Sequence, residues 1–290
     1  MAASEWQSWV GRTEVRKDSF DLSRLRGMAA TLDDPMTIED GTPLSPGWHW
    51  LFFNPMAPNH ELGADGHPRR GAFLPPVELP RRMWASGELT FEAPLHAGAA
   101  AVRESEIVSV EQKMGAQGTL VFVTVRHRTI ASGVLAIDET QNIVYRGAAG
   151  TPTKRPAAAR DSAPEPVSAP RWRETFQFDE VVLFRYSALT FNEHRIHYDR
   201  PYATGVEGYP GLVVHGPLLA TLLMRACARG EAGLRGKPVS LRRFSYRATA
   251  PVFVRETIML EGLAGADGGI EVAVRREDRT LAMSGIAHPI

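Results

Sequence analysis

An almost wholly apolar helix in the second half of the chain constrains the fold most. Pro217 suits the first helical position, where a missing N–H costs nothing. From Leu218 to Cys227 the apolar residues form a stripe that needs cover on most sides. Only strand-like alternation follows this helix, so a curled antiparallel sheet has to supply the cover. The pattern predicts an α+β fold and makes Gly230 the expected C-cap of the helix.

The two halves of the chain repeat the same order of patterns. In each half, a short strand leads into an amphipathic helix and a polar turn, and alternating strands follow. The matched segments begin at Val10 and Trp172, at Arg81 and Arg242, and at Val123 and Val272. Three matches in the same order favour a duplicated domain over chance similarity between strands.

A stretch of alanine, proline and charged residues separates the two halves. It has no apolar periodicity, which is typical of an extended linker. We therefore predict a first unit over residues 1–146, a linker over residues 147–171 and a second unit over residues 172–290.

Composition excludes several classes of partner. The 33 lysines and arginines equal the 33 aspartates and glutamates, so no net field attracts nucleic acid or an anionic membrane. No run of eighteen apolar residues and no secretory signal is present, which predicts a soluble, cytoplasmic protein. Cys227 is the one cysteine, so no internal disulfide can form, and its apolar surroundings indicate packing.

A polar turn before the apolar helix carries the residues best suited to chemistry. Asn192 and His197 lie five positions apart in it, and His215-Gly216 precedes the helix. Histidine transfers protons readily near neutral pH, because its ordinary pKa is about 6.5. The N–H of Gly216, at the positive end of a helix dipole, could stabilise an oxyanion. Purely structural roles stay open: a satisfied turn histidine for His197, a turn residue for Asn192 and an N-cap for Gly216.

The same residues resemble a known motif. In MaoC-like hotdog hydratases an aspartate is followed by asparagine at plus two, histidine at plus five and aspartate at plus seven, and then by His-Gly and a central helix. His197, Asp199 and His215-Gly216 match this pattern, whereas Asn192 replaces the catalytic aspartate. His194 replaces the asparagine. With ELGADGHP and LPRRMWASG upstream, the chain is similar to hydroxyacyl-thioester dehydratases of type 2, in the branch of mesaconyl-C4-CoA and itaconyl-CoA hydratases.

The resemblance implies a double hotdog fold: two curved antiparallel sheets, each wrapping a central helix. The first half would be degenerate and shape the acyl and CoA pocket, because its corresponding turn, ATLDDPMTIEDG, lacks a histidine. The implied reaction is reversible addition of water to an enoyl-CoA, most directly mesaconyl-C4-CoA or itaconyl-CoA, to give citramalyl-CoA. His197 would be the base and acid, Asn192 the positioning group and Gly216 the oxyanion donor. Asp199 and His215 would support them structurally.

Two other functions stay open. A 3-hydroxyacyl-ACP or 3-hydroxyacyl-CoA dehydratase of fatty-acid metabolism would use the same chemistry on straight chains. A hotdog that binds acyl thioesters without catalysis would need no proton transfer. A thioesterase is weaker, because no carboxylate occupies the expected position. CoA is part of the substrate, so no cofactor is expected; assembly into a homo-oligomer is left open.

The substrate pocket can be sketched from residue types. A dicarboxylic acyl group needs a cation, and arginine binds carboxylates with two parallel hydrogen bonds. The candidates are Arg81, Arg82, Arg185 and Arg195. The aromatic, proline-punctuated segment from Pro46 to Pro68 is typical of a functional loop, which makes Trp50 and His67 pocket candidates, with Trp48 and Asp65 beside them.

A metal site is the alternative use of this turn. His194, His197 and Asp199 form a two-histidine, one-carboxylate set. Nothing else nearby completes a coordination shell, so we expect no metal.

Overall fold

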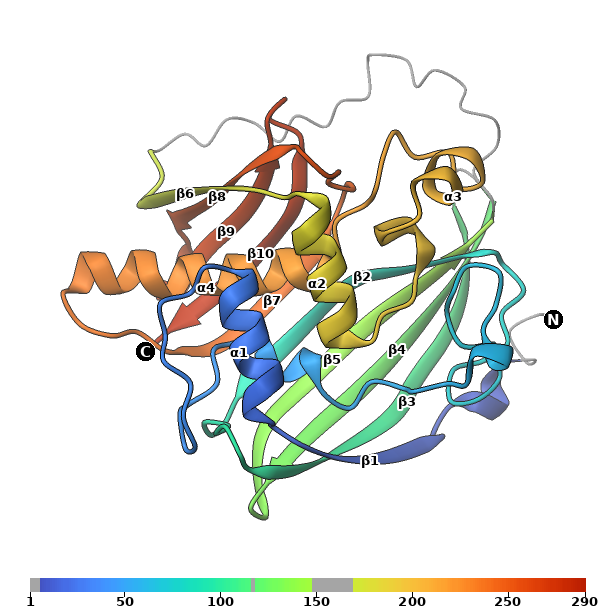
Figure 1. The fold of residues 1–290 in the computed structure, drawn as a ribbon, viewed down its shortest axis with the longest axis horizontal. Helices are drawn as coiled ribbons and strands as arrows, with labels where there is room; N and C mark the ends of the chain where they lie inside the picture. The colour runs from blue at the N-terminus through green and yellow to red at the C-terminus, as the bar shows by residue number, and fades with distance from the viewer. Residues whose placement is uncertain (1–5, 116–117, 148–168) are drawn as a thin grey trace.

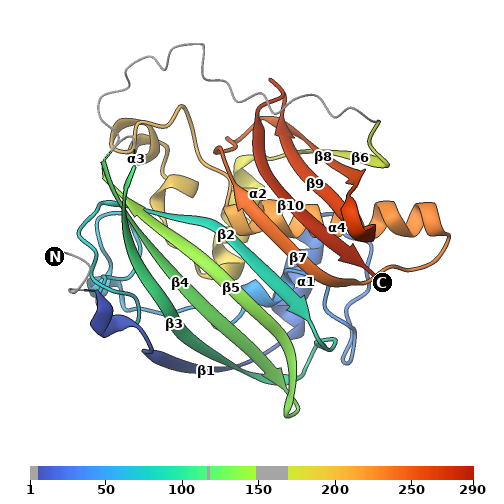
Figure 2. The same cartoon turned by 180° about the vertical axis from the view of Figure 1, so that it is seen from behind.

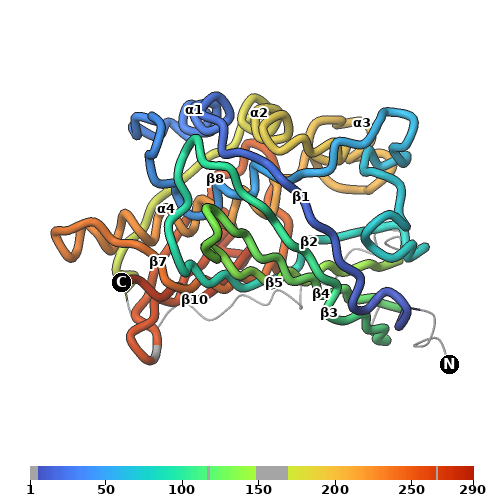
Figure 3. The backbone as a smooth tube through the Cα atoms, turned by 90° about the horizontal axis from the view of Figure 1, so that it is seen from below, coloured from blue at the N-terminus to red at the C-terminus, as the bar shows by residue number. Residues whose placement is uncertain are grey.

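The computed structural model describes residues 6–115, 118–147 and 169–290, so most of the predicted linker lies outside the described residues. One ten-stranded sheet, antiparallel at every pairing, runs through both halves. The helices gather on one face of it, as the front and back views show (Figures 1 and 2). Seen from below, α1, α2 and α3 form a layer over the sheet (Figure 3). The α+β prediction is confirmed.

The strands of the two halves follow the same order, mirrored about the centre of the sheet. From edge to edge the order is β1-β3-β4-β5-β2-β7-β10-β9-β8-β6. The first half supplies β1 (Thr13–Ser19), β2 (Arg81–Phe91), β3 (Ala100–Gly115), β4 (Gly118–Ala131) and β5 (Val134–Arg146). The second half supplies β6 (Trp172–Gln177), β7 (Leu241–Ala248), β8 (Thr257–Ala264), β9 (Ile270–Arg276) and β10 (Leu281–Pro289). The central pair β2 and β7 joins the halves, with Gly87 opposite Tyr246.

The helices that follow the first strand of each half begin in the same way. Asp21 caps α1 (Leu22–Thr31) by accepting a hydrogen bond from the backbone of Arg24, at 2.8 Å. Asp179 caps α2 (Glu180–Thr190) by the same bond from Val182, also at 2.8 Å. Such caps satisfy an orphan backbone N–H. The match between the segments that begin at Val10 and Trp172 therefore extends to the cap.

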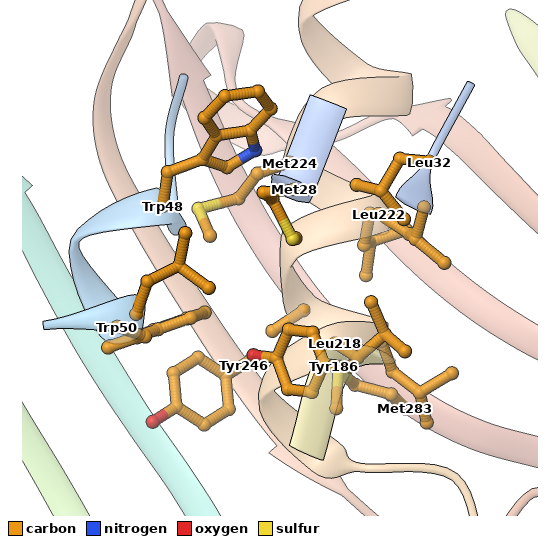
Figure 4. Close-up of a cluster of buried hydrophobic side chains, with 14 of the residues drawn as sticks. Met28, Leu32, Trp48, Trp50, Tyr186, Leu218, Leu222, Met224, Tyr246 and Met283 are labelled. Carbon is orange, nitrogen blue, oxygen red and sulfur yellow. The ribbon is translucent and has the colours of Figure 1, made fainter. Parts of the chain in front are cut away.

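The apolar helix predicted in the second half is α4 (Gly216–Arg235), and it lies against β6 to β10. Leu218 and Leu222 pack in a core with Met28 and Leu32 of the first half (Figure 4). The prediction that Gly230 is the C-cap is wrong. The helix continues to Arg235, and Gly236 is the C-cap, with a left-handed φ of 65°. No helix in the described part of the chain is long and apolar enough to cross a bilayer.

The described residues of the first half form no counterpart of α4. Between α1 and β2, the described chain forms just the short turns η3 (Trp48–Leu51) and η4 (Asn59–Glu61). Proline and glycine interrupt this segment, which prevents a long helix. The expectation of a central helix therefore holds for the second half, and the space under the first half of the sheet stays free for a pocket.

Gly230, which is not the C-cap of α4, permits close packing between α4 and β6. A Cβ at this position would lie 2.3 Å from Cγ of Trp172. We expect Gly230→Ala to lower the free energy of unfolding by about 1–3 kcal/mol, because the crowded ring must shift. Gly233→Ala is the matched control in the same helix, since nothing lies within 4 Å of its added methyl group. Urea denaturation measures both; equal stability of the two variants would contradict this packing.

Candidate active site

His197 is a buried base at the end of the polar turn (residues 191–199). It closes the one-turn helix η6 (Arg195–His197) and is 7% exposed. Its Nδ1 lies 2.7 Å from the carbonyl oxygen of Val213. Because that oxygen can only accept, we assign the ring hydrogen to Nδ1, which leaves a lone pair on Nε2. Burial lowers the pKa of His197 to about 4, against the opposing effect of Val213, so the ring is neutral at pH 7 and can accept a proton.

The ring of His215 packs against the ring of His197. The two imidazole rings stack, with centroids 3.6 Å apart and planes 19° apart. Nε2 of His215 lies 2.9 Å from the hydroxyl of Ser187 on α2. Burial lowers the pKa of His215 well below its usual range, so the stack does not place two charged rings in contact. This geometry agrees with the supporting role predicted for His215.

Gly216 opens α4 beside the stacked rings. No described residue accepts a hydrogen bond from its backbone N–H, so this donor is available to a ligand. A Cβ at this position would lie 2.8 Å from Cε3 of Trp84, which comes from β2 in the first half. Glycine therefore lets a tryptophan of one half close over the helix start of the other.

One cavity of about 560 Å³ brings the predicted catalytic residues together. Asn192, His197 and Gly216 all line it. Residues of the first half, including Trp50, His67 and Trp84, form the opposite wall. A base and an oxyanion donor can therefore act on the same bound molecule.

Asn192 has a structural task as well as a place in the cavity wall. Its Oδ1 accepts a hydrogen bond of 3.0 Å from the backbone N–H of His194, which forms an Asx turn. Phe191 before it adopts the left-handed region, with φ of 48°, at the end of α2. The amide nitrogen of Asn192 is thus the part of the side chain left to hold a ligand.

Asp199 lies away from the cavity and organises the turn. It caps α3 (Arg200–Gly205) through the backbone N–H of Tyr202, at 3.1 Å, and pairs with Arg195 at 2.7 Å. This agrees with the predicted supporting role. It also disfavours a metal bound by His194, His197 and Asp199, because the carboxylate is already occupied.

The four predicted arginines fall into three groups. Arg185 is exposed on α2 and Arg195 is held by Asp199, and neither lines the cavity, which corrects the prediction for both. Arg81 lines the cavity but forms an ion pair of 2.9 Å with Glu207. Arg82 lines the cavity and has no ion pair with any described residue. It is therefore the candidate best placed to meet a carboxylate.

The aromatic segment of the first half divides between core and cavity. Trp48 and Trp50 both lie in the buried cluster (Figure 4). Of the two, only Trp50 also lines the cavity. The indole N–H of Trp50 donates to Glu139 at 2.9 Å. Burial opposes ionisation of Glu139, but hydrogen bonds and charges from His49, His127 and Gln141 lower its pKa to about 2.

The buried charge of Glu139 escaped the sequence reasoning, as did the cavity-lining Arg103 and His127 on neighbouring strands. The signal was available in principle. Glu139 interrupts a strand at a position where the alternation calls for an inward-facing residue.

His67 reaches the cavity from the first half together with Asp65. Its Nδ1 lies 3.1 Å from a carboxylate oxygen of Asp65, and its ring centroid lies 4.1 Å from that of His194. Within the described ranges, Asp65, His67 and His194 are the one group whose possible ligand atoms lie within 4.8 Å of one another. The bond between His67 and Asp65 already uses one donor and one acceptor of this group, so we interpret it as an acid–base pair.

A continuous antiparallel sheet built by two halves, with a neutral imidazole and a free helix-start N–H in one cavity, defines a class: the hotdog hydratases and dehydratases of acyl thioesters. The family model for hydroxyacyl-thioester dehydratase type 2 matches residues 47–254, and the chain belongs to this family. It is 45% identical over 258 residues to the mesaconyl-C4-CoA hydratase of Chloroflexus aurantiacus, with 87% of each chain covered.

Solved structures agree on the fold. A MaoC-like dehydratase from Phytophthora capsici superimposes with a TM-score of 0.65 at 16% identity, over 96% of this chain and 95% of its own. A Mycobacterium tuberculosis protein with a double hotdog fold gives 0.59 at 13% identity, over 97% and 95%. The double hotdog prediction is confirmed, and so is the prediction of a hydro-lyase acting on acyl thioesters.

Proposed function

We propose that the protein reversibly adds water to a branched C5 dicarboxylic enoyl-CoA, with mesaconyl-C4-CoA as the preferred substrate and citramalyl-CoA as the product. The observation that carries this proposal is that a neutral His197 and an available Gly216 N–H line the same cavity as Arg82, which forms no ion pair with any described residue. The relative that is 45% identical has the name mesaconyl-C4-CoA hydratase, which supports this choice.

The chemistry divides among three groups. His197 Nε2 takes a proton from water as the water oxygen bonds to the β-carbon. The π electrons move toward the thioester oxygen, where the N–H of Gly216 and the helix dipole stabilise the negative charge of the enolate. The enolate then takes a proton at its α-carbon, which completes the addition of water. The amide nitrogen of Asn192 holds the water or the carbonyl in line, since an amide cannot exchange the proton itself.

The position of Arg82 favours a dicarboxylic substrate. It lies two residues before Trp84, the ring that closes over Gly216, and its charge contributes to lowering the pKa of both His67 and His194. A substrate carboxylate beside this guanidinium would form a charge-assisted pair inside the cavity. In mesaconyl-C4-CoA that carboxylate is on the carbon that water attacks. A straight-chain 3-hydroxyacyl thioester offers nothing to this cation.

A side-by-side assay of mesaconyl-C4-CoA, itaconyl-CoA and crotonyl-CoA tests the substrate. We expect Arg82→Gln to lower kcat/KM for the two dicarboxylic thioesters by about 10-fold or more, because an ion pair away from bulk water is lost. Hydration of crotonyl-CoA should change little. Arg185→Gln, an exposed site outside the cavity, is the matched control.

Formation of the hydroxyacyl-CoA product, separated from the substrate by chromatography, reports the rate for each thioester. Preference of the unmodified enzyme for crotonyl-CoA would contradict the dicarboxylic substrate and favour the fatty-acid dehydratase. Hydration of none of the three would favour a binding protein.

Three predictions accompany this proposal. We place the enzyme in the cytoplasm, which agrees with a bacterial relative. The reaction would need no cofactor, because the CoA thioester itself activates the double bond. Assembly into a homo-oligomer stays a prediction.

A further inference from the structure

A loop of the first half is fixed against the polar turn of the second. The backbone carbonyl of Asp65 accepts a hydrogen bond of 2.9 Å from the backbone N–H of Arg195. The carbonyl of Ala64 accepts one of 3.0 Å from the guanidinium of the same arginine. Gly66, the next residue in the chain, has a left-handed φ of 90°, and a Cβ there would lie 2.0 Å from the carbonyl oxygen of Glu193. Only glycine permits this approach.

The docked loop extends a row of imidazole rings. His67 lies 4.1 Å from His194, centroid to centroid, and His194 lies 5.4 Å from His197. The carboxylate of Asp65 is at Nδ1 of His67, so the hydrogen of the neutral ring is assigned to Nδ1. No described residue forms a hydrogen bond to its Nε2, and the residue lines the cavity. This is the arrangement of a carboxylate-oriented histidine base.

Hydration moves two protons, one from water and one to the α-carbon. Asn192, which replaces the family's aspartate, can transfer neither of them. Asn192 has an amide, and Asp199 is turned to Arg195. A protonated His197 would face the rings of His194 and His215, and no carboxylate among the described residues pairs with it. Protonated His67, by contrast, would pair with Asp65 at 3.1 Å.

We propose that His67, oriented by Asp65, is the second acid–base catalyst and transfers the proton at the α-carbon; this inference rests on the hydratase function proposed above. In dehydration, Nε2 of His67 takes the α-hydrogen as a proton. The C–H electron pair becomes the double bond through the enolate, and the protonated His197 gives its proton to the departing hydroxyl, which leaves as water. In hydration the same two groups act in reverse. One proton thus passes between the two histidines in each turnover, and its return through solvent or His194 restores the starting state.

The surrounding charges fit this exchange. The hydrogen bond and charge of His67 hold the pKa of Asp65 well below its usual range despite burial, so the carboxylate stays ionised. Burial, Arg82 and Arg70 lower the pKa of His67 to about 4, and Asp65 opposes them. His194 and His197 are the titratable groups that face it from the polar turn. An anionic substrate paired with Arg82 would offset that arginine and make protonated His67 more accessible.

The test compares His67→Gln with His60→Gln, a matched control on an exposed histidine of the same loop region. We expect His67→Gln to lower kcat by about 100-fold or more with little change in KM, because proton transfer by a positioned group contributes this much. The limb of the pH profile on which hydration falls as pH rises should disappear, since protonated His67 is the donor. His60→Gln should match the unmodified enzyme.

Asp65→Asn is a second variant, and its expected shift in the pH profile would not arise if His67 had only a structural role. Without the carboxylate, protonated His67 is less stable, so its pKa falls and the alkaline limb of hydration should move to lower pH. Thermal melting checks that each variant is folded. The apparent pKa values belong to the histidine pair rather than to one ring, so the shift of the limb is the readout.

Three results would overturn the inference. The first is a His67→Gln rate within about three-fold of the unmodified enzyme, because acid–base catalysis contributes far more, and the second is a lower rate with an unchanged pH profile. The third is loss of activity of the unmodified enzyme in EDTA, which would assign Asp65, His67 and His194 to a metal. If the unmodified enzyme hydrates no enoyl-CoA, the proposed function fails instead, so the two failures are distinguishable.

Discussion

His197→Ala is expected to lower kcat for hydration by at least about two orders of magnitude, because it removes the base proposed to take the proton from water. His197→Gln should lose as much while keeping a donor for the carbonyl of Val213, which separates loss of the base from loss of that hydrogen bond. Asn192→Ala should lose less, since it removes a positioning group and one turn hydrogen bond. Formation of the hydroxyacyl-CoA product at saturating substrate measures all three.

The role of His197 as a base also predicts the direction in which the rate of the unmodified enzyme changes with pH. His197 must be neutral to take the proton from water, and burial lowers its pKa to about 4. Hydration should therefore keep its base through neutral pH and lose it as pH falls through that value. A His197→Gln variant that hydrates at the normal rate would show that the base lies elsewhere.

Gly216→Ala is expected to lower kcat/KM by about 100- to 1,000-fold, the range found when one oxyanion donor is lost. The added methyl group would lie 2.8 Å from Trp84, so either the indole or the start of α4 must move away from the substrate. A shift of the helix start takes the N–H away from the thioester oxygen, and a shift of the indole opens the cavity wall that holds the substrate against this N–H. The measurement is the steady-state rate with mesaconyl-C4-CoA.

Gly233→Ala is again the control, because it makes the same chemical change in the same helix where nothing lies within 4 Å. It should keep full activity and gain about 0.5–1 kcal/mol of stability, since alanine loses less backbone entropy in a helix. If Gly216→Ala keeps full activity while folded, the close contact between Gly216 and Trp84 is not needed for catalysis.

Local patterns sufficed to predict most of the fold. The apolar stripe after Pro217 indicates a covered helix, and alternation from Arg81 and Arg242 indicates strands that become the central pair of the sheet. Helix ends were harder. Gly230 looked like a cap because it is a glycine after an apolar stripe, but packing against Trp172 is what requires it.

The site was predictable where its residues are close in sequence. Asn192, His197 and Gly216 lie within one segment, and the structure brings them to one cavity. Contacts between the halves could not be predicted, because periodicity carries no information about which distant segments meet. The hydrogen bond from Arg195 to the carbonyl of Ala64 spans 131 positions. It shows that Arg195, predicted to bind substrate, instead holds the loop of the first half against the polar turn. Arg82 and Arg185 likewise differ only in their three-dimensional surroundings.

The presence of α4 in one half alone has a consequence for evolution. In an assembly of two identical subunits, every substitution appears twice, so a change that widens one pocket also disturbs the helix that catalyses in the other. Here each substitution appears only once. Positions of the first half that line the cavity, apart from His67, can therefore change to fit new acyl groups while α4 and His197 stay as they are.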